Sequence, residues 1–351
     1  MFSIIFLFLV SNIPRYSCSL RKLNIWDVTL YNGESYILML RIWRLMPFVS
    51  HFVVQVSTNT YTNIERNVSF WPFEKEIQEY IDSGLLTIFY SKLRCIHPHP
   101  WGDAWCLDAN ARLVLFENWK TLNPHYGDYI LNCDLDEIPT RDGMRYMIEH
   151  PLEDYYSMYG INTNPNFMFE GGDCYTNSFI KYTPETHEFM WYRDRRRKWP
   201  NFPIATHCSY CFNNYSLYIS KQIAFAHTDQ ANYPFLNKSY LFRTHYCRHD
   251  IQNYFPMKPA KIFLNDTELV PPDPRFAYLL DPNFTLDISQ TIYTEKDLPT
   301  LCDEENNWWI DPEKRLLKPR WRVEDPNRDR RWSPGHKKFP PGLPSRRKPR
   351  R

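Results

Sequence analysis

The chain has little glycine, with 10 glycines against 28 prolines in 351 residues. No stretch has the closely spaced glycines of a phosphate-binding loop, so any phosphate group must be held by side chains and a metal ion. The sequence also lacks an apolar run of the roughly 20 residues that a membrane-spanning helix needs. Its net charge is only +2, which by itself implies neither a nucleic-acid nor a membrane partner.

Aromatic residues, in contrast, are abundant. They make up 17% of the chain, and hydrophobic residues make up 43%. This composition excludes a mostly disordered protein. The length of 351 residues is enough for one large α/β domain or two small ones. The aromatic share fits a protein that stacks rings on sugars, although a large core would explain it equally well.

The N-terminal segment and the cysteines point to the secretory pathway. Phe2–Val10 is too short to span a bilayer but fits the apolar part of a signal peptide, with Ser17 and Ser19 as a cleavage site. We therefore expect residues 1–19 to be a signal peptide or short signal anchor, the only part that would associate with a membrane. Nine cysteines favour disulfides there, and the odd number leaves a thiol unpaired unless Cys18 is removed. Five Asn-x-Ser/Thr sequons begin at Asn67, Asn214, Asn237, Asn265 and Asn283.

Between these segments the chain alternates strand and helix patterns, which predicts an α/β fold with a mostly parallel sheet. The expected strands are Phe52–Val56, Leu85–Tyr90 and the run from Tyr129, and the expected helices are Ile37–Leu45, Glu74–Ser83, Trp105–Trp119 and Gly143–His150. We expect one domain over residues 20–312. Residues 313–351 are rich in Arg, Lys and Pro, which predicts a disordered basic tail. A nucleic-acid-binding role for this tail conflicts with a location in the lumen of the secretory pathway.

The most informative stretch runs from Tyr129 to Pro139, an apolar segment that ends in three acids and a proline. The apolar part predicts a buried strand that ends at or before Pro139, since proline cannot donate to a β-ladder. Asp134 and Asp136 would then lie at the carboxyl end of a core strand, where open α/β sheets bind ligands. In an extended segment the two point the same way, which predicts a shared Mg²⁺ or Mn²⁺ ion. A solvated acidic turn is the alternative.

A basic cluster lies between Arg193 and Lys198. Charge runs are usually solvated faces, but arginines that face the acids would hold a diphosphate. Further on, His207–Phe212 has the sequence His-Cys-Ser-Tyr-Cys-Phe. Its two cysteines fit a zinc half-site completed by Cys247 or His249, a redox pair, or disulfide cysteines. The sequons favour the disulfides.

Five stretches together resemble a known family in the same order along the chain. They are Asn32-Gly33-Glu34 with Leu38, Leu40 and Arg41; Phe52-Val53-Val54 through Ser57, Thr60 and Tyr61; Asp134-Leu135-Asp136-Glu137-Ile138-Pro139; His207–Phe212 with Lys221 and His227; and Pro271-Pro272 to Leu280. They resemble glycosyltransferase family 17, the β-1,4-mannosyl-glycoprotein 4-β-N-acetylglucosaminyltransferases that add bisecting GlcNAc. The resemblance covers roughly Leu23 to Leu280.

The resemblance implies a GT-A-like, Rossmann-type nucleotide-sugar-binding domain. It implies an inverting transfer of GlcNAc from UDP-GlcNAc to the core β-mannose of glycoprotein N-glycans, in the Golgi lumen or Golgi membrane, with Mn²⁺ or Mg²⁺. Asp134 and Asp136 would hold the metal. Contacts to the donor would come from Asp134, Arg112, Arg197, His207 and Lys221. The catalytic base would be one of Asp229, Asp250 and Glu137, and Glu137 has the alternatives of orienting Asp136 or capping the next helix.

The chain departs from the family pattern at three places. Val56 stands where the family has Glu, Ala205-Thr206 stand where it has Gly-Trp, and Asp108 with Arg112 replaces its Glu-x-x-x-Arg pair. The first two departures favour an alternative function, a catalytically inactive homologue that binds glycans or nucleotide sugars. A metal-dependent phosphodiesterase would use the same acids, but the sequence near Asp134 supplies none of the histidines that such a site needs.

Overall fold

A computed structural model describes residues 23–96, 102–164, 167–194, 204–226, 235–248, 258–259, 270–281 and 284–302, with 158–164, 167–177, 194 and 258–259 described by their backbone alone. The expected signal peptide at 1–19 and basic tail at 313–351 lie outside these residues. None of the described helices is long and apolar enough to cross a membrane.

The strands of the described residues form one mixed sheet. They are β1 (Ile25–Tyr31), β2 (His51–Ser57), β3 (Leu86–Ser91), β4 (Tyr129–Asp134), β5 (Glu137–Pro139), β6 (Tyr155–Asn164), β7 (Phe167–Lys181), β8 (Ala205–His207) and β9 (Lys258–Pro259). Their order is β3-β2-β1-β4-β7-β6-β8-β5, and β9 pairs with β7. The first four are parallel neighbours, whereas β7 runs antiparallel to both β4 and β6.

The helices follow the strands in the alternation that the sequence predicts. They are α1 (Ser35–Leu45), α2 (Glu74–Asp82), α3 (Asp103–Lys120), α4 (Arg141–Glu149), α5 (Phe189–Asp194), α6 (Tyr215–Ala224) and α7 (Lys238–Tyr246), with short 3-10 helices η3 (Pro274–Leu279), η4 (Ile288–Gln290) and η5 (Leu298–Thr300). The predicted α/β class is confirmed, and the expected strands and helices before residue 150 lie within about two residues of the observed ones.

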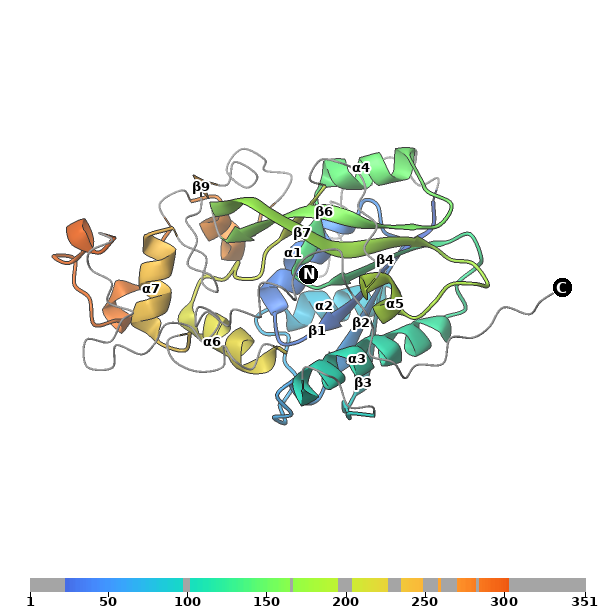
Figure 1. Cartoon of the computed structure of the whole chain (residues 1–351), viewed down its shortest axis with the longest axis horizontal. Coiled ribbons are helices and arrows are strands. Elements are labelled where there is room, and N and C mark those ends of the chain that lie inside the picture. The colour runs from blue at the N-terminus through green and yellow to red at the C-terminus, as the bar shows by residue number, and fades with distance from the viewer. Residues whose placement is uncertain are drawn as a thin grey trace, which may run out of the picture. The chain divides into compact units, whose positions relative to one another are not determined.

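Two parts of the sheet do not follow from the sequence pattern. Asp27 interrupts the apolar run of β1, so this central strand lacks the usual strand signature. The long hairpin of β6 and β7, near the top of Figure 1, comes from a segment that stands out in the sequence only by its aromatic and asparagine residues. Its strand β7 pairs antiparallel with β4, β6 and β9, whereas β6 pairs in parallel with β8.

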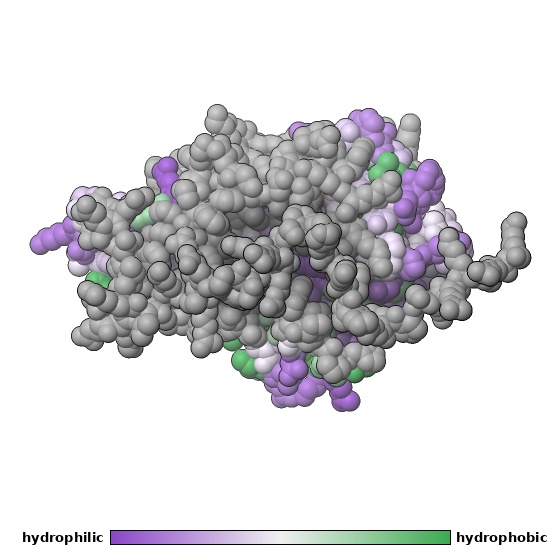
Figure 2. Space-filling view, viewed as in Figure 1, coloured by the Kyte–Doolittle hydropathy of each residue, from purple (hydrophilic) through white to green (hydrophobic). Residues whose placement is uncertain are grey.

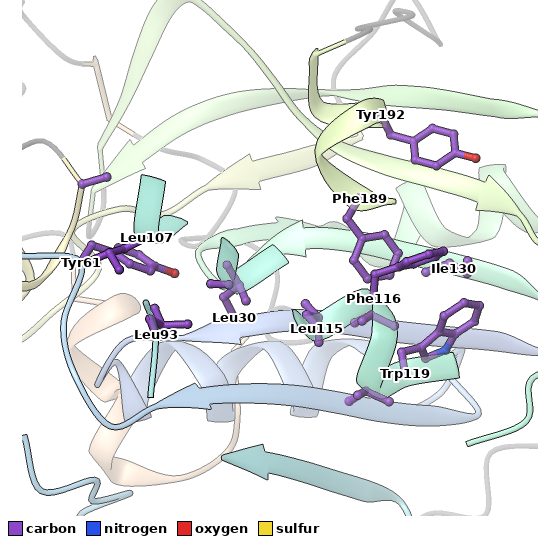
Figure 3. Packing of buried hydrophobic residues seen from close by; sticks show 14 of the residues in the cluster. Leu30, Tyr61, Leu93, Leu107, Leu115, Phe116, Trp119, Ile130, Phe189 and Tyr192 are labelled. Carbon is purple, nitrogen blue, oxygen red and sulfur yellow. The ribbon is translucent and has the colours of Figure 1, made fainter. Parts of the chain in front are cut away.

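The core between the sheet and α3 contains large apolar side chains. Leu115, Phe116 and Trp119 of α3 are buried against Ile130 of β4 and Phe189 of α5 (Figure 3). The rings of Phe116 and Phe189 lie 5.1 Å apart and nearly perpendicular. This packing fixes α3 and the short α5 relative to the carboxyl end of β4, where the acids lie.

Helix α4 follows the acids and shows an amphipathic pattern. Met144 and Met147 are buried, and in Figure 2 hydrophilic residues predominate, with a small hydrophobic patch among them, in the region where Figure 1 places α4. Thr140 caps the helix, because its side chain accepts a hydrogen bond from the N–H of Gly143 at 2.9 Å. The expectation that Glu137 caps this helix is therefore wrong. A Cβ on Gly143 would lie 2.1 Å from the carbonyl oxygen of Ile204.

We expect Gly143→Ala to destabilise the protein by about 1–3 kcal/mol, because the added methyl group overlaps a backbone carbonyl. The clash outweighs the intrinsic helix preference for alanine of about 1 kcal/mol. Thermal denaturation measures the effect, with Glu149→Ala at an exposed position of the same helix as the control, expected to stay within about 0.5 kcal/mol. An unchanged or higher melting temperature for Gly143→Ala would contradict this packing.

Candidate active site

A single buried arginine fixes the backbone that carries the acids. Arg41 of α1 is fully buried and pairs with Asp27 of β1 through two contacts, Nε to Oδ2 at 2.8 Å and Nη2 to Oδ1 at 2.6 Å. Its Nη1 donates to the carbonyl oxygens of Asp134, Leu135 and Glu137 at 3.1, 3.3 and 2.7 Å. The guanidinium therefore ties the central strand to the turn between β4 and β5.

That turn separates the two aspartates. Asp134 is the last residue of β4, but Leu135 and Asp136 form a turn before β5 begins. The expectation that the two side chains lie in one extended segment and point the same way is therefore wrong. Each carboxylate has its own cationic partners, and the site has an arginine half around Asp134 and a lysine half around Asp136.

Two arginines hold Asp134. Its Oδ1 lies 2.6 Å from Nη2 of Arg112 on α3, and its Oδ2 lies 2.8 Å from Nη2 of Arg193 on α5. Arg112 also pairs with Asp108, one turn earlier on the same helix, at 3.0 Å. Burial raises the pKa of Asp134, but Arg112 and Arg193 outweigh it and bring the pKa down to about 2. Asp134 is therefore ionised at neutral pH.

A buried lysine bridges Asp136 to a second acid. Nζ of Lys221 on α6 lies 2.6 Å from both Oδ2 of Asp136 and Oε1 of Glu34, which precedes α1. Burial acts to lower the pKa of Lys221, but Asp136 and Glu34 raise it above its usual value. Burial acts to raise the pKa of Asp136, yet Lys221 and then His207 hold it well below the usual range. Lys221 is therefore a charged ammonium that orients Asp136.

Glu137 lies under the turn. Its side chain is 2% exposed, its Oε2 accepts a hydrogen bond from the N–H of Asp134 at 2.9 Å, and its Oε1 lies 3.9 Å from Arg193. Burial and then the negative charge of Asp134 raise its pKa to about 7. Glu137 therefore contacts the backbone of Asp134, and the alternative role of orienting Asp136 stays a prediction.

Strand β8 brings His207 to the acids. Nε2 of His207 lies 3.5 Å from Oδ2 of Asp136 and 2.8 Å from Oγ of Ser209. No histidine is close to the acids along the sequence. In the folded chain His207 is close to them, because β8 pairs with β5. The N–H of Cys208 donates to the carbonyl of Asp136 at 2.7 Å, so the next residue also supports the turn.

The cysteines of this segment form disulfides, as the sequence favours. Cys208 is bonded to Cys211, and Cys247 is bonded to Cys302, so the zinc half-site is wrong. A third disulfide joins Cys95 and Cys106. Among the described residues, Cys133 is a free and buried cysteine, consistent with the odd cysteine count.

The donor atoms at Asp136 fit one hard divalent cation. Lys221 and His207 contact Oδ2 of Asp136, and no hydrogen bond to its Oδ1 is found among the described residues. Both oxygens of Asp134 are bound to arginines, so Asp136 fits better as the direct ligand. No cluster of three or more His, Cys, Asp or Glu side chains in the described part of the chain is arranged to hold a metal. Any further oxygen ligands would come from a diphosphate and water, as is common for Mg²⁺.

The structure brings together Arg112, Asp134, Asp136, Glu137, His207 and Lys221 from the sequence-based candidates. Arg197, Asp229 and Asp250 lie outside the described residues. Sequence reasoning missed two members. Glu34 appears in the sequence only as part of a motif, and Arg193 belongs to the basic cluster from which Arg197 was the expected contact. In a helix Arg193 lies on the same side as Phe189, and it directly follows Tyr192; both of these residues are buried. This helical spacing would have identified Arg193 as a member of the site.

The positions that depart from the family pattern are buried. Val56 is fully buried in β2, so it offers a ligand no polar group. Thr206 of β8 is 1% exposed, and its hydroxyl donates to the carbonyl of Ile138 at 3.2 Å and accepts from Nη1 of Arg44 at 3.3 Å. Thr206 therefore has a structural role next to the turn. Asp108 and Arg112 remain paired on α3 despite the shorter acid.

Comparisons with known proteins come from sequence and from structure. The sequence model described as Glycosyltransferase family 17 matches residues 13–264. No curated protein matches the chain. Among solved structures, the chain is similar to one described as the inositol-1-phosphate CTP transferase from T. maritima, with 7% identity and a TM-score of 0.26, over 45% of this chain and 71% of that chain. A structural likeness this low supports no conclusion about fold or function.

We expect Arg41→Met to destabilise the protein by about 3–5 kcal/mol, because it leaves the buried carboxylate of Asp27 without its partner. The matched control is Arg145→Met, which breaks an exposed pair with Asp142 and should cost no more than about 1 kcal/mol. Chemical denaturation measures both. Equal effects of the two substitutions would contradict the role of Arg41 as the anchor of the turn.

We expect the stability of the protein to fall as pH rises from about 4.5 to about 7, through Glu137. Its folded pKa of about 7 lies above the ordinary 4.5, so the folded state holds a proton that the unfolded state has lost. Glu137→Gln should remove this contribution, on the order of 1–3 kcal/mol, and make the variant the more stable protein near pH 8.

Denaturation at about pH 5 and about pH 8 measures this difference, with Glu149→Gln as the control for loss of an exposed acid. The lowered pKa of Asp134 acts in the opposite sense, since its stabilising effect is lost only as pH falls from about 4 towards 2. A Glu137→Gln variant with the same pH dependence as the wild type would show that this carboxyl is ionised throughout the range.

Proposed function

Because this chain belongs to glycosyltransferase family 17 and is a glycosyltransferase, we propose that it transfers GlcNAc from UDP-GlcNAc to the core β-mannose of N-glycans. The transfer would form a β-1,4 linkage with inversion, as the sequence resemblance implies. The observation that carries the proposal is the set of cations, Arg112, Arg193 and Lys221, held around two ionised aspartates at the carboxyl edge of the parallel strands.

The cations suit a diphosphate leaving group. As the bond from the sugar to UDP breaks, negative charge develops on the diphosphate, and fixed positive groups stabilise that charge best when they are already in place. Arg193 is held by α5, whose Phe189 and Tyr192 are buried in the core, so its guanidinium needs little reorganisation. Arg112 is similarly fixed by its pair with Asp108. We propose that both contact the diphosphate of the donor.

Asp136 would hold Mn²⁺ or Mg²⁺ through Oδ1, while Lys221 holds the opposite oxygen. When bound, the ion would act as a Lewis acid on the leaving diphosphate. Lys221 and Glu34 keep Asp136 in one orientation, and Arg41 keeps the backbone of the turn in place. Asp136 would therefore meet the ion in an orientation that is already set, which would lower the cost of binding it.

The catalytic base must take the proton of the attacking mannose hydroxyl. We propose Asp229 or Asp250 for this step, both outside the described residues. Glu137 has a pKa near neutrality, as a base requires, but its side chain is 2% exposed and its Oε2 accepts from the N–H of Asp134. We therefore propose Glu137 as a positioning residue that supports Asp134.

The proposed partners are UDP-GlcNAc and glycoprotein N-glycans, and the proposed location is the Golgi lumen or Golgi membrane. The three disulfides support an oxidising compartment. Of the sequon asparagines, Asn67 and Asn237 are exposed and accessible to glycosylation. Association with a membrane would occur only through residues 1–19. We propose no nucleic-acid partner.

One observation favours a second candidate, an inactive homologue that binds glycans or nucleotide sugars. Val56, at the position where family members have an acid, is fully buried in β2 and provides no carboxylate. If that carboxylate were essential for turnover, the site would still bind the donor without transferring its sugar. Turnover and binding therefore have to be measured separately.

We expect the purified protein to release UDP from UDP-GlcNAc only when a biantennary N-glycan and Mn²⁺ are both present. EDTA should abolish this release, because the diphosphate would lose its cation. The assay measures free UDP with each component omitted in turn. Binding of UDP with Mn²⁺ but no release would support the inactive homologue, and the absence of UDP binding would refute the donor-binding role of Asp134 and Asp136.

We expect Asp136→Asn to lower the rate of transfer by at least about 100-fold, since it removes the charged metal ligand. Asp142→Asn, at an exposed acid on α4, is the control and should leave the rate unchanged. Titration of Mn²⁺ against each protein in the presence of UDP measures loss of the metal, and circular dichroism checks that each variant is folded. A variant Asp136→Asn with near-normal turnover would exclude Asp136 as the ligand.

A further inference from the structure

The cysteine loop, residues 208–211, follows β8 and is closed by the disulfide between Cys208 and Cys211. Both cysteines are fully buried, and Tyr210 between them is 1% exposed. Loops usually run over the surface of a protein, so a loop that is packed inside needs partners for its backbone and its polar side chains. The contacts that provide these partners indicate what the loop does.

The backbone of the cysteine loop is held at both ends. At its beginning, the N–H of Cys208 donates to the carbonyl oxygen of Asp136 at 2.7 Å, in the turn between β4 and β5. At its end, the hydroxyl of Tyr278 on η3 donates to the carbonyl oxygen of Cys211 at 2.8 Å. Because the disulfide joins the two ends, the loop is a rigid connection between this turn and η3.

Tyr210 contacts α6 through three residues on one face of that helix. Its ring stacks on the ring of Tyr218, with centroids 5.8 Å apart and an interplanar angle of 5°. Its hydroxyl accepts a hydrogen bond from Nε2 of Gln222 at 2.9 Å, and Nζ of Lys221 lies 6.0 Å from its ring centroid. Residues three and four apart are neighbours on a helix surface, so Tyr210 fixes the face of α6 that carries the lysine.

The ammonium of Lys221 depends on its surroundings for its position. Nζ lies 2.6 Å from Oδ2 of Asp136 and 2.6 Å from Oε1 of Glu34, so the two contacts alone favour neither acid. A lysine side chain is a point charge on a flexible stem, and the backbone that carries it must therefore be fixed. The hydrogen bond from Gln222 to Tyr210, one residue further along α6, does this inside the protein, where Gln222 is fully buried.

We propose that Tyr210 is a positioning residue for the pair of Lys221 and Asp136. The cysteine loop binds the backbone of Asp136 through Cys208, and two residues later Tyr210 binds the helix that carries Lys221. The loop therefore sets the separation between the turn and α6, which keeps the ammonium on Oδ2 of Asp136 and leaves Oδ1 for the cation. The inference rests on the proposed function, and Tyr210 acts on the ion only through Lys221.

The test measures binding of Mn²⁺ to the full chain by calorimetry in the presence of UDP. Tyr210→Phe keeps the ring but removes the hydrogen bond to Gln222, and it should weaken Mn²⁺ binding about three- to tenfold with an unchanged number of sites per chain. The matched control is Tyr218→Phe, because the hydroxyl of Tyr218 is buried and has no hydrogen-bond partner among the described residues. This control should bind Mn²⁺ like the wild type.

Gln222→Met removes the same hydrogen bond from the side of α6 and should weaken Mn²⁺ binding by a similar factor. The double variant should bind about as well as either single variant, because both changes remove one interaction. Gln222→Met decides the question if circular dichroism shows that Tyr210→Phe is not folded.

Unchanged Mn²⁺ binding by Tyr210→Phe, or an equal loss in Tyr218→Phe, would overturn the positioning role and leave the transferase function intact. Fewer sites per chain at an unchanged affinity would assign Tyr210 to stability alone and also overturn that role. Failure of the wild type to bind Mn²⁺ together with UDP would overturn both proposals.

Discussion

The buried pair of Arg41 and Asp27 is the interaction on which the candidate site depends. Burying two charges is costly, and the cost is recovered only when every hydrogen-bonding position is used. Here Asp27 accepts two hydrogen bonds, and the remaining guanidinium nitrogen binds three carbonyl oxygens of the turn that carries the acids. A neutral side chain of similar size would hold α1 against the sheet, but it would not fix the turn.

With the turn fixed, neighbouring elements can surround its acids with separate cations. Arg112 comes from α3, Arg193 from α5 and Lys221 from α6, and each contacts one of the two aspartates beside the turn. The charges of Asp134 and Asp136 are thus stabilised without a bound metal, and both pKa values lie below the ordinary range despite burial. One oxygen of Asp136 is left for a ligand. This division supports the proposal that the site binds a diphosphate and a divalent cation together.

Helix α3 supports the acid site and also lines a cavity of about 670 Å³. Its core face, with Leu115, Phe116 and Trp119, packs against the sheet and fixes the whole helix. The first turns then line the cavity, and the middle of the helix carries Arg112 to Asp134. Since a helix is a stiff element, the distance between the cavity and Asp134 is set by the number of residues between them.

The sequence by itself determined the α/β class, the buried strand that leads to Asp134 and the acidic stretch after it, because local patterns of apolar residues and proline act over a few neighbours. It also indicated disulfides, and the resemblance pointed to the family that the sequence match supports. The turn at Asp136 was not predictable, since an extended segment and a turn are equally compatible with Asp-Leu-Asp. Only tertiary structure decided that Asp134 faces arginines and Asp136 faces Lys221, because these partners are distant in sequence and meet through sheet pairing and helix packing.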